Sequence, residues 1–117
     1  DYAFSMGEIE NKHFIGLRYL FGDDYHNYRQ GVKYFNNSEY YKSVTSFKEV
    51  LDNNPYNYKA LKLAEEAERR ILISSHYRKG IDYFNQGLNS EAYQEWKLAL
   101  ELDPENKELK ALLSNGK

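Results

Sequence analysis

The side chains that could carry catalysis or hold a metal ion are scattered along this chain. None of the three histidines, His13, His26 and His76, lies at metal-ligand spacing from a carboxylate or from another histidine. The adjacent acids Asp23 and Asp24 could bind Mg²⁺, but they stand where a helix is predicted to begin, and carboxylates are stabilised there by exposed backbone N–H groups. The sequence has no Gly-x-Ser-x-Gly pattern and no phosphate-binding glycine loop. We therefore expect no enzyme active site, no metal and no cofactor.

One cluster of basic and aromatic residues could suggest nucleic-acid binding. Its members are Arg69, Arg70, Tyr77, Arg78 and Lys79. Three glutamates lie about one helical turn away, and the whole chain has a net charge of −2, so no strong field favours a polyanion. No apolar run reaches the roughly 18 residues that a membrane-spanning helix needs. We expect a solvated helix face here, and neither nucleic acid nor direct membrane insertion.

The main feature of the sequence is an internal repeat. Residues 28–57, YRQGVKYFNNSEYYKSVTSFKEVLDNNPYN, align without gaps with residues 77–106, YRKGIDYFNQGLNSEAYQEWKLALELDPEN, which begin 49 residues later. Ten of the thirty aligned positions are identical. They are Tyr28/Tyr77, Arg29/Arg78, Gly31/Gly80, Tyr34/Tyr83, Phe35/Phe84, Asn36/Asn85, Lys48/Lys97, Leu51/Leu100, Pro55/Pro104 and Asn57/Asn106. Such a pattern indicates a structural unit that is present twice.

Apolar residues within each repeat recur at helical spacing, and a polar break divides them into two short helices. We expect Ser90 to cap the second helix of the second repeat, and the prolines at 55 and 104 to stop the second helices. After Pro104, the leucines at 109, 112 and 113 predict a short closing helix.

This pattern resembles the tetratricopeptide repeat, a helix-turn-helix unit with small and aromatic residues at fixed places followed by a proline. The matching positions are Gly31, Tyr34, Ser43, Phe47, Val50 and Pro55 in the first unit, and Gly80, Tyr83, Ala92, Trp96, Ala99 and Pro104 in the second. Glycine on the first helix of a unit, helix A, would let helix B approach closely, and the aromatic residues would fill the space between the helices. The resemblance implies an all-α fold of α-solenoid type.

The interval of 49 exceeds the 34 residues of the family's unit. Residues 57–86 contain no proline, and their one glycine is Gly80, so we predict a single long helix shared by the two units. A break at Ser74 and Ser75 is the alternative. We place unit one at 25–73 and unit two at 74–114, within a domain of residues 25–117. We expect residues 1–24 to form a separate segment with a helix at 8–21, and a strand over 13–21 is the alternative. Because the chain starts at Asp1, we also expect a fragment of a longer protein.

In the family that this chain resembles, the A helices bind peptide segments of partner proteins. The residues on that face here are Tyr28, Val32, Phe35 and Asn36 in unit one and Tyr77, Ile81, Phe84 and Asn85 in unit two. They contain no lysine pair of the kind that grips a terminal carboxylate. We therefore expect a non-enzymatic scaffold that helps to assemble a multi-protein complex and binds an apolar or helical segment. A bacterial source, in cytoplasm or periplasm, is our expectation. The alternative is a structural spacer whose aromatic face makes a homo-oligomer.

Overall fold

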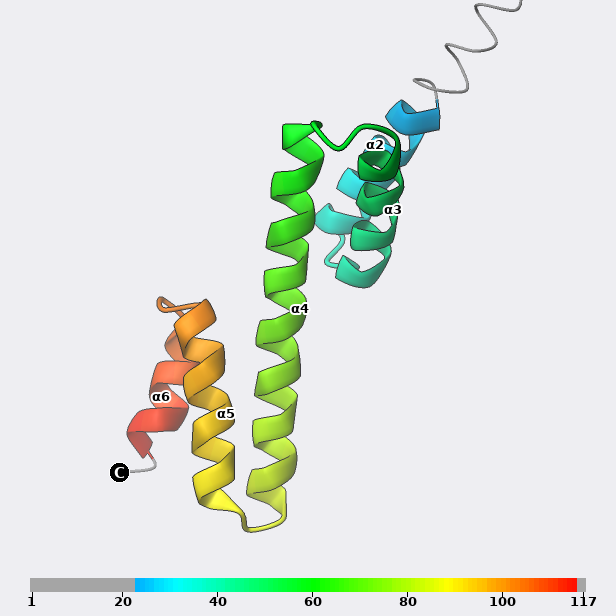
Figure 1. Ribbon diagram of the computed structural model, residues 1–117. Coiled ribbons are helices and arrows are strands. Elements are labelled where there is room, and N and C mark those ends of the chain that lie inside the picture. Colours follow the sequence, from blue (N-terminus) through cyan, green and yellow to red (C-terminus); the bar gives the residue numbers. More distant parts are fainter. Residues whose placement is uncertain (1–22, 116–117) are drawn as a thin grey trace, which may run out of the picture. The chain divides into compact units, whose positions relative to one another are not determined.

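The computed structural model of the chain describes residues 23–115, which form helices joined by short turns (Figure 1). The helices are α2 (Asp23–Asn36), α3 (Tyr40–Asn53), α4 (Tyr58–Asn85), α5 (Asn89–Leu102) and α6 (Lys107–Asn115). Of the described residues, 85% are helical and none is in a strand, which confirms the predicted all-α class. The predicted helix at 8–21 and its strand alternative lie outside the described residues.

The long helix is unbroken. α4 has 28 residues, almost the whole of the predicted range 57–86, so the alternative break at Ser74 and Ser75 is wrong. A new helix has no start signal here, because neither serine is followed three residues later by the Glu or Gln of a capping box. Instead, the Ser74 hydroxyl accepts a hydrogen bond from Arg78 one turn later, at 3.5 Å. The described part of the chain forms two compact units, one ending at Ala67 and the other beginning at Glu68, so their boundary falls inside α4. From here on, unit one and unit two mean these two units.

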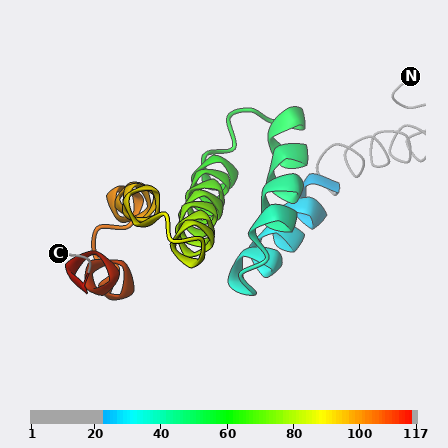
Figure 2. The ribbon, with the colours of Figure 1, turned by 90° about the horizontal axis from the view of Figure 1, so that it is seen from below.

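Unit one contains α2, α3 and the first part of α4. Figure 2 shows α2 and α3 side by side. Its core consists of Phe47 and Val50 from α3 with Ala60 and Ala64 from α4, against which Tyr28 and Val32 pack. Phe47 fits because a Cβ at position 31 would lie 2.6 Å from its Cε1 atom, so only glycine allows this approach.

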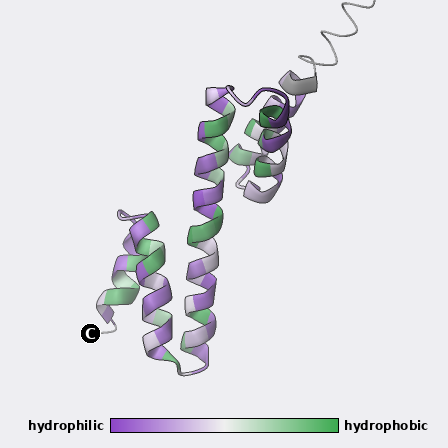
Figure 3. Ribbon diagram, in the orientation of Figure 1, coloured by the Kyte–Doolittle hydropathy of each residue, from purple (hydrophilic) through white to green (hydrophobic). Residues whose placement is uncertain are grey.

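Unit two repeats this construction with the second part of α4, α5 and the closing helix α6. Its core consists of Ala92, Trp96 and Ala99 from α5 and Leu109 from α6. A Cβ at position 80 would overlap the indole ring of Trp96, lying 2.7 Å from Cε2. The predicted packing of a helix-A glycine on a helix-B aromatic ring is therefore present in both units. Tyr34 and Tyr83, the equivalent tyrosines of the two A helices, are half-buried. Figure 3 shows hydrophobic and hydrophilic residues interleaved along the helices.

The turns after the two A helices are also equivalent. Ser38 has a φ of 63° and Gly87, 49 residues later, has a φ of 80°. In each turn the next residue donates its N–H to a carbonyl five residues earlier, from Glu39 to Tyr34 at 2.8 Å and from Leu88 to Tyr83 at 2.9 Å. This is the Schellman motif, in which a left-handed residue lets the chain satisfy the last carbonyls of a helix.

The Schellman turn corrects one expectation about capping. Ser90 is not the N-cap of α5, because Leu88 occupies that place and makes no side-chain cap bond. Since the Leu88 carbonyl already accepts the N–H of Ala92 at 3.0 Å, helical bonding starts directly after the turn.

Side-chain caps occur instead at the shared asparagines Asn57 and Asn106. The side-chain oxygen of Asn57 accepts the N–H of Ala60 at 3.1 Å, and that of Asn106 accepts the N–H of Leu109 at 3.0 Å. The preceding prolines are exposed, and the B helices end two residues before them, as predicted.

Candidate protein-binding surface

In unit one, the predicted partner-binding residues lie along α2 but do not all face the same way. Tyr28 and Val32 are half-buried and pack on the core, with the ring centroids of Tyr28 and Phe47 5.8 Å apart. Phe35 turns toward α3, where its ring meets Tyr40 edge-on at 5.5 Å and 78°. Asn36 is exposed. The core therefore fixes the two residues at the centre of this face and leaves their outer edges accessible.

An open groove follows this face of α2. Its volume is about 500 Å³, within the range of roughly 300 to 1,000 Å³ that binding pockets have. It is lined by Tyr25, Tyr28, Arg29, Val32, Lys33, Asn36 and Asn37. The structure thus brings together three of the four residues that the sequence predicted for unit one. Phe35 is not among the lining residues, because it stacks on Tyr40.

Sequence reasoning missed four of the lining residues, Tyr25, Arg29, Lys33 and Asn37. Tyr25, Arg29 and Lys33 are spaced by four residues and therefore form one row along α2. The guanidinium of Arg29 lies over the Tyr25 ring at 5.7 Å from its centroid, a cation–π contact that orders both side chains. A second hollow of about 470 Å³ flanks the same row on its other side. The i, i+4, i+8 spacing was the available signal.

In unit two, the corresponding residues are engaged within the unit. Tyr77 and Ile81 are half-buried against the core of α5 and α6. The Tyr77 hydroxyl donates a hydrogen bond to Glu108 Oε1 on α6 at 2.8 Å. This bond, with a smaller effect of burial, raises the pKa of Tyr77 above its usual value of 10.0. The closing helix therefore uses much of this face.

The outer end of the unit-two face is more open. Phe84 is 46% exposed, and the ring centroids of Phe84 and Trp96 are 5.7 Å apart. Asn85 is exposed. This end therefore offers a small aromatic surface and an amide.

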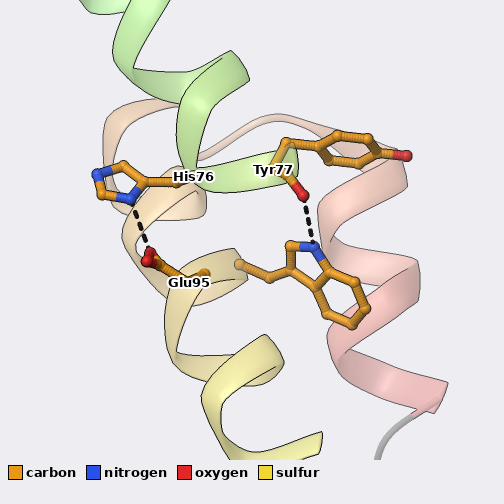
Figure 4. Close-up of polar contacts among 4 residues, drawn as sticks. His76, Tyr77 and Glu95 are labelled. Atoms are coloured by element: carbon orange, nitrogen blue, oxygen red, sulfur yellow. Dashed lines mark hydrogen bonds and ion pairs between the residues drawn. The ribbon is translucent and has the colours of Figure 1, made fainter. Parts of the chain in front are cut away.

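A polar pair joins α4 to α5 beside this face (Figure 4). His76 Nδ1 lies 2.8 Å from Glu95 Oε2, and the side chains are only 21% and 16% exposed. The neighbouring Trp96 Nε1 donates a hydrogen bond to the Tyr77 carbonyl at 3.2 Å. No spacing pattern predicts the His76 contact, because 19 residues and a turn separate the partners. Both contacts fix helix B against helix A.

The basic cluster of α4 also makes contacts inside unit two. The Arg69 guanidinium donates to the carbonyl of Leu102, the last residue of α5, where a cation is favourable for the helix dipole. Arg78 reaches Ser74, as described above, and Tyr77 reaches Glu108. These three members of the cluster therefore have partners within the fold.

Residues 23–115 hold no set of three histidine, aspartate or glutamate side chains placed to share a metal ion. Within the same residues, no helix combines the length and the apolar character needed to cross a membrane.

Comparisons of the chain with protein-family models, with curated proteins and with solved structures find no match. Kinship with the tetratricopeptide repeat proteins therefore stays a prediction from the residues.

Proposed function

We propose that this chain is a non-enzymatic protein-interaction module of the tetratricopeptide kind, which helps to assemble a multi-protein complex. Its binding surface is the A-helix face of unit one, the groove along α2, and its ligand is an apolar or helical segment of another protein. A role in bacterial envelope, secretion or motility assemblies is the setting that the resemblance favours.

The observation that carries this proposal is the α2 groove, which gathers Tyr28, Val32 and Asn36. Tyrosine provides a large rigid contact with one polar end and is enriched where binding energy concentrates. An amphipathic helix lays its apolar side chains into grooves of this kind. The exposed amide of Asn36 can bind a partner's backbone at one end.

The rigidity of the surrounding unit supports the same proposal. Gly31 seats α2 directly on Phe47, and the buried Ser43 hydroxyl donates a hydrogen bond to the Gly31 carbonyl at 2.9 Å. Because α2 is held at its centre, little conformational freedom is lost when a ligand binds. Unit two is the weaker candidate, since Tyr77 is bonded to the closing helix.

The test is a binding titration with a fluorescein-labelled amphipathic helical peptide that has a leucine-rich apolar face and glutamines on its polar face. Tyr28→Ala should weaken binding about thirtyfold, which corresponds to ~2 kcal/mol. Tyr41→Ala is the matched control, because Tyr41 is 69% exposed on α3 and does not line the groove. Asn36→Ala, at an exposed position, should weaken binding without changing the thermal stability.

Equal affinity of wild type, Tyr28→Ala and Asn36→Ala for the peptide would overturn the proposal. Sedimentation equilibrium of the same proteins addresses the alternative, self-association. A concentration-dependent dimer that Tyr28→Ala dissolves would assign the face to a second copy of the chain.

A further inference from the structure

The rim of the α2 groove carries an unbalanced positive charge. Arg29 and Lys33 line the groove, and none of the other lining residues in the described part of the chain is acidic. The chain as a whole has a net charge of −2, so this local excess of cations is opposite to the overall balance. Both side chains are exposed, and the ion pairs among residues 25–115 include neither of them. Their charge is therefore accessible to a ligand.

The two cations also lie on the same face of α2, one helical turn apart. Residues four apart on a helix are neighbours about 6 Å apart on the same face, so Arg29 and Lys33 present a charged edge one turn long. Tyr25 continues the row and holds the Arg29 guanidinium over its ring. The second hollow also borders Arg29 and Lys33, so a ligand can reach the cations from either side of the row.

We propose that the α2 groove selects an acidic segment of a partner protein, with apolar side chains against Tyr28 and Val32 and carboxylates on Arg29 and Lys33. This inference rests on the proposed function and adds the partner's charge to it. The planar guanidinium of Arg29 can bind a carboxylate through two parallel hydrogen bonds, whereas the Lys33 ammonium acts as a point charge. A segment with acids spaced one helical turn apart matches this edge.

The experiment compares two labelled helical peptides that share the same leucine-rich face. One has glutamates on the polar face and the other has glutamines at the same positions. The glutamate peptide should bind the wild-type chain about tenfold more tightly at low salt, and high salt should remove most of that preference.

The decisive variant is the charge reversal Arg29→Glu with Lys33→Glu, which should make the glutamine peptide the tighter ligand. Its matched control is Lys48→Glu with Lys59→Glu. These lysines are exposed on α3 and α4 outside the groove, and their reversal changes the net charge by the same amount. The control should keep the preference for the glutamate peptide.

The inference is overturned if the wild-type chain binds both peptides equally, or if the control pair removes the preference as fully as the groove pair. It is also overturned if the glutamate peptide does not bind, or if a short single-stranded DNA binds the groove more tightly than this peptide. In the first case, loss of glutamine-peptide binding in Tyr28→Ala would still uphold the proposed function. Failure of that function is recognised separately, by glutamine-peptide binding that is insensitive to Tyr28→Ala.

Discussion

At Gly31 and Gly80, the absence of a side chain allows the two helices of each unit to touch. A Cβ at either position would come closer to the ring of Phe47 or Trp96 than real Cβ atoms approach other atoms. Glycine inside a helix normally costs about 1 kcal/mol relative to alanine. In this chain the close approach compensates, because Phe47 is 0% and Trp96 1% exposed.

Gly80→Ala should therefore destabilise the chain by a net 1 to 3 kcal/mol, about the cost of overpacking a well-filled core, even though alanine is the better helix former. Chemical denaturation followed by circular dichroism measures the free energy of unfolding. Lys79→Ala, at an exposed position of the same helix, is the control and should stay within about 0.5 kcal/mol of wild type. An increase in stability for Gly80→Ala would show that α4 and α5 do not meet at this residue.

A second pair of residues tests the turns. Ser38→Gly should stabilise the chain by about 0.5 to 1 kcal/mol, because serine is strained at a φ of 63°. Gly87→Ser should destabilise it by about 1 kcal/mol, because serine would be strained at a φ of 80°. An added Cβ at Gly87 would meet no atom within 4 Å, so this backbone strain is the expected cost of the substitution. Thermal melts of both variants decide the question. Shifts of the same sign would argue against equivalent turns.

Sequence reasoning at this scale succeeded where a residue's role is local to its repeat. The two glycines and their aromatic partners were predicted because helical spacing fixes which residues face the neighbouring helix. The contact of His76 with Glu95 depends on how two helices approach, and the hydrogen bond of Tyr77 to Glu108 spans 31 residues. No local pattern carries such information.

At the scale of elements, the repeat describes how each helix begins and ends. The long helix was predicted because residues 57–86 contain no proline and only one glycine, Gly80. The N-cap of α5 was wrong because Ser90 was chosen by residue type, whereas the preceding Schellman turn decides where helical bonding starts. The groove-lining row Tyr25, Arg29 and Lys33 was also overlooked, although its spacing was visible once α2 was predicted to be helical.

The caps at Asn57 and Asn106 give a prediction for element ends. Asn57→Ala and Asn106→Ala should each lower the free energy of unfolding by about 1 kcal/mol, because each loses a side-chain bond to a helical N–H. Asn89→Ala is the matched control. Asn89 opens α5 but does not cap it, so its replacement should change stability by only a few tenths of a kcal/mol. A loss at Asn89 equal to the other two would contradict the assigned caps.

The continuity of α4 gives a prediction for the interior of a helix. Ser75→Pro should cost about 3 kcal/mol or more, because proline removes an interior hydrogen bond and its ring clashes with the preceding turn. Ser75→Ala serves as the control for loss of the hydroxyl and should have little effect. Urea denaturation measures both. If Ser75→Pro unfolds at nearly the same urea concentration as Ser75→Ala, the helix is interrupted at this point.

At the scale of the whole molecule, the chain combines two units of the same internal construction with different uses of the A-helix face. In unit two, Glu108 of α6 accepts a hydrogen bond from the Tyr77 hydroxyl. In unit one, Tyr28 and Val32 border an open groove with a basic rim. The sequence identified the equivalent residues in both units. It could not distinguish the two faces, because the difference depends on which neighbouring helix covers each one.

The central claim, that the α2 groove is the binding surface, is tested most directly by nuclear magnetic resonance of the ¹⁵N-labelled chain during titration with the glutamate peptide. Chemical-shift changes should concentrate on residues 25–37, with the largest at Val32, Lys33 and Asn36, and should saturate with the peptide. Saturating changes confined to α5 and α6, or no changes at all, would contradict the assignment of this surface.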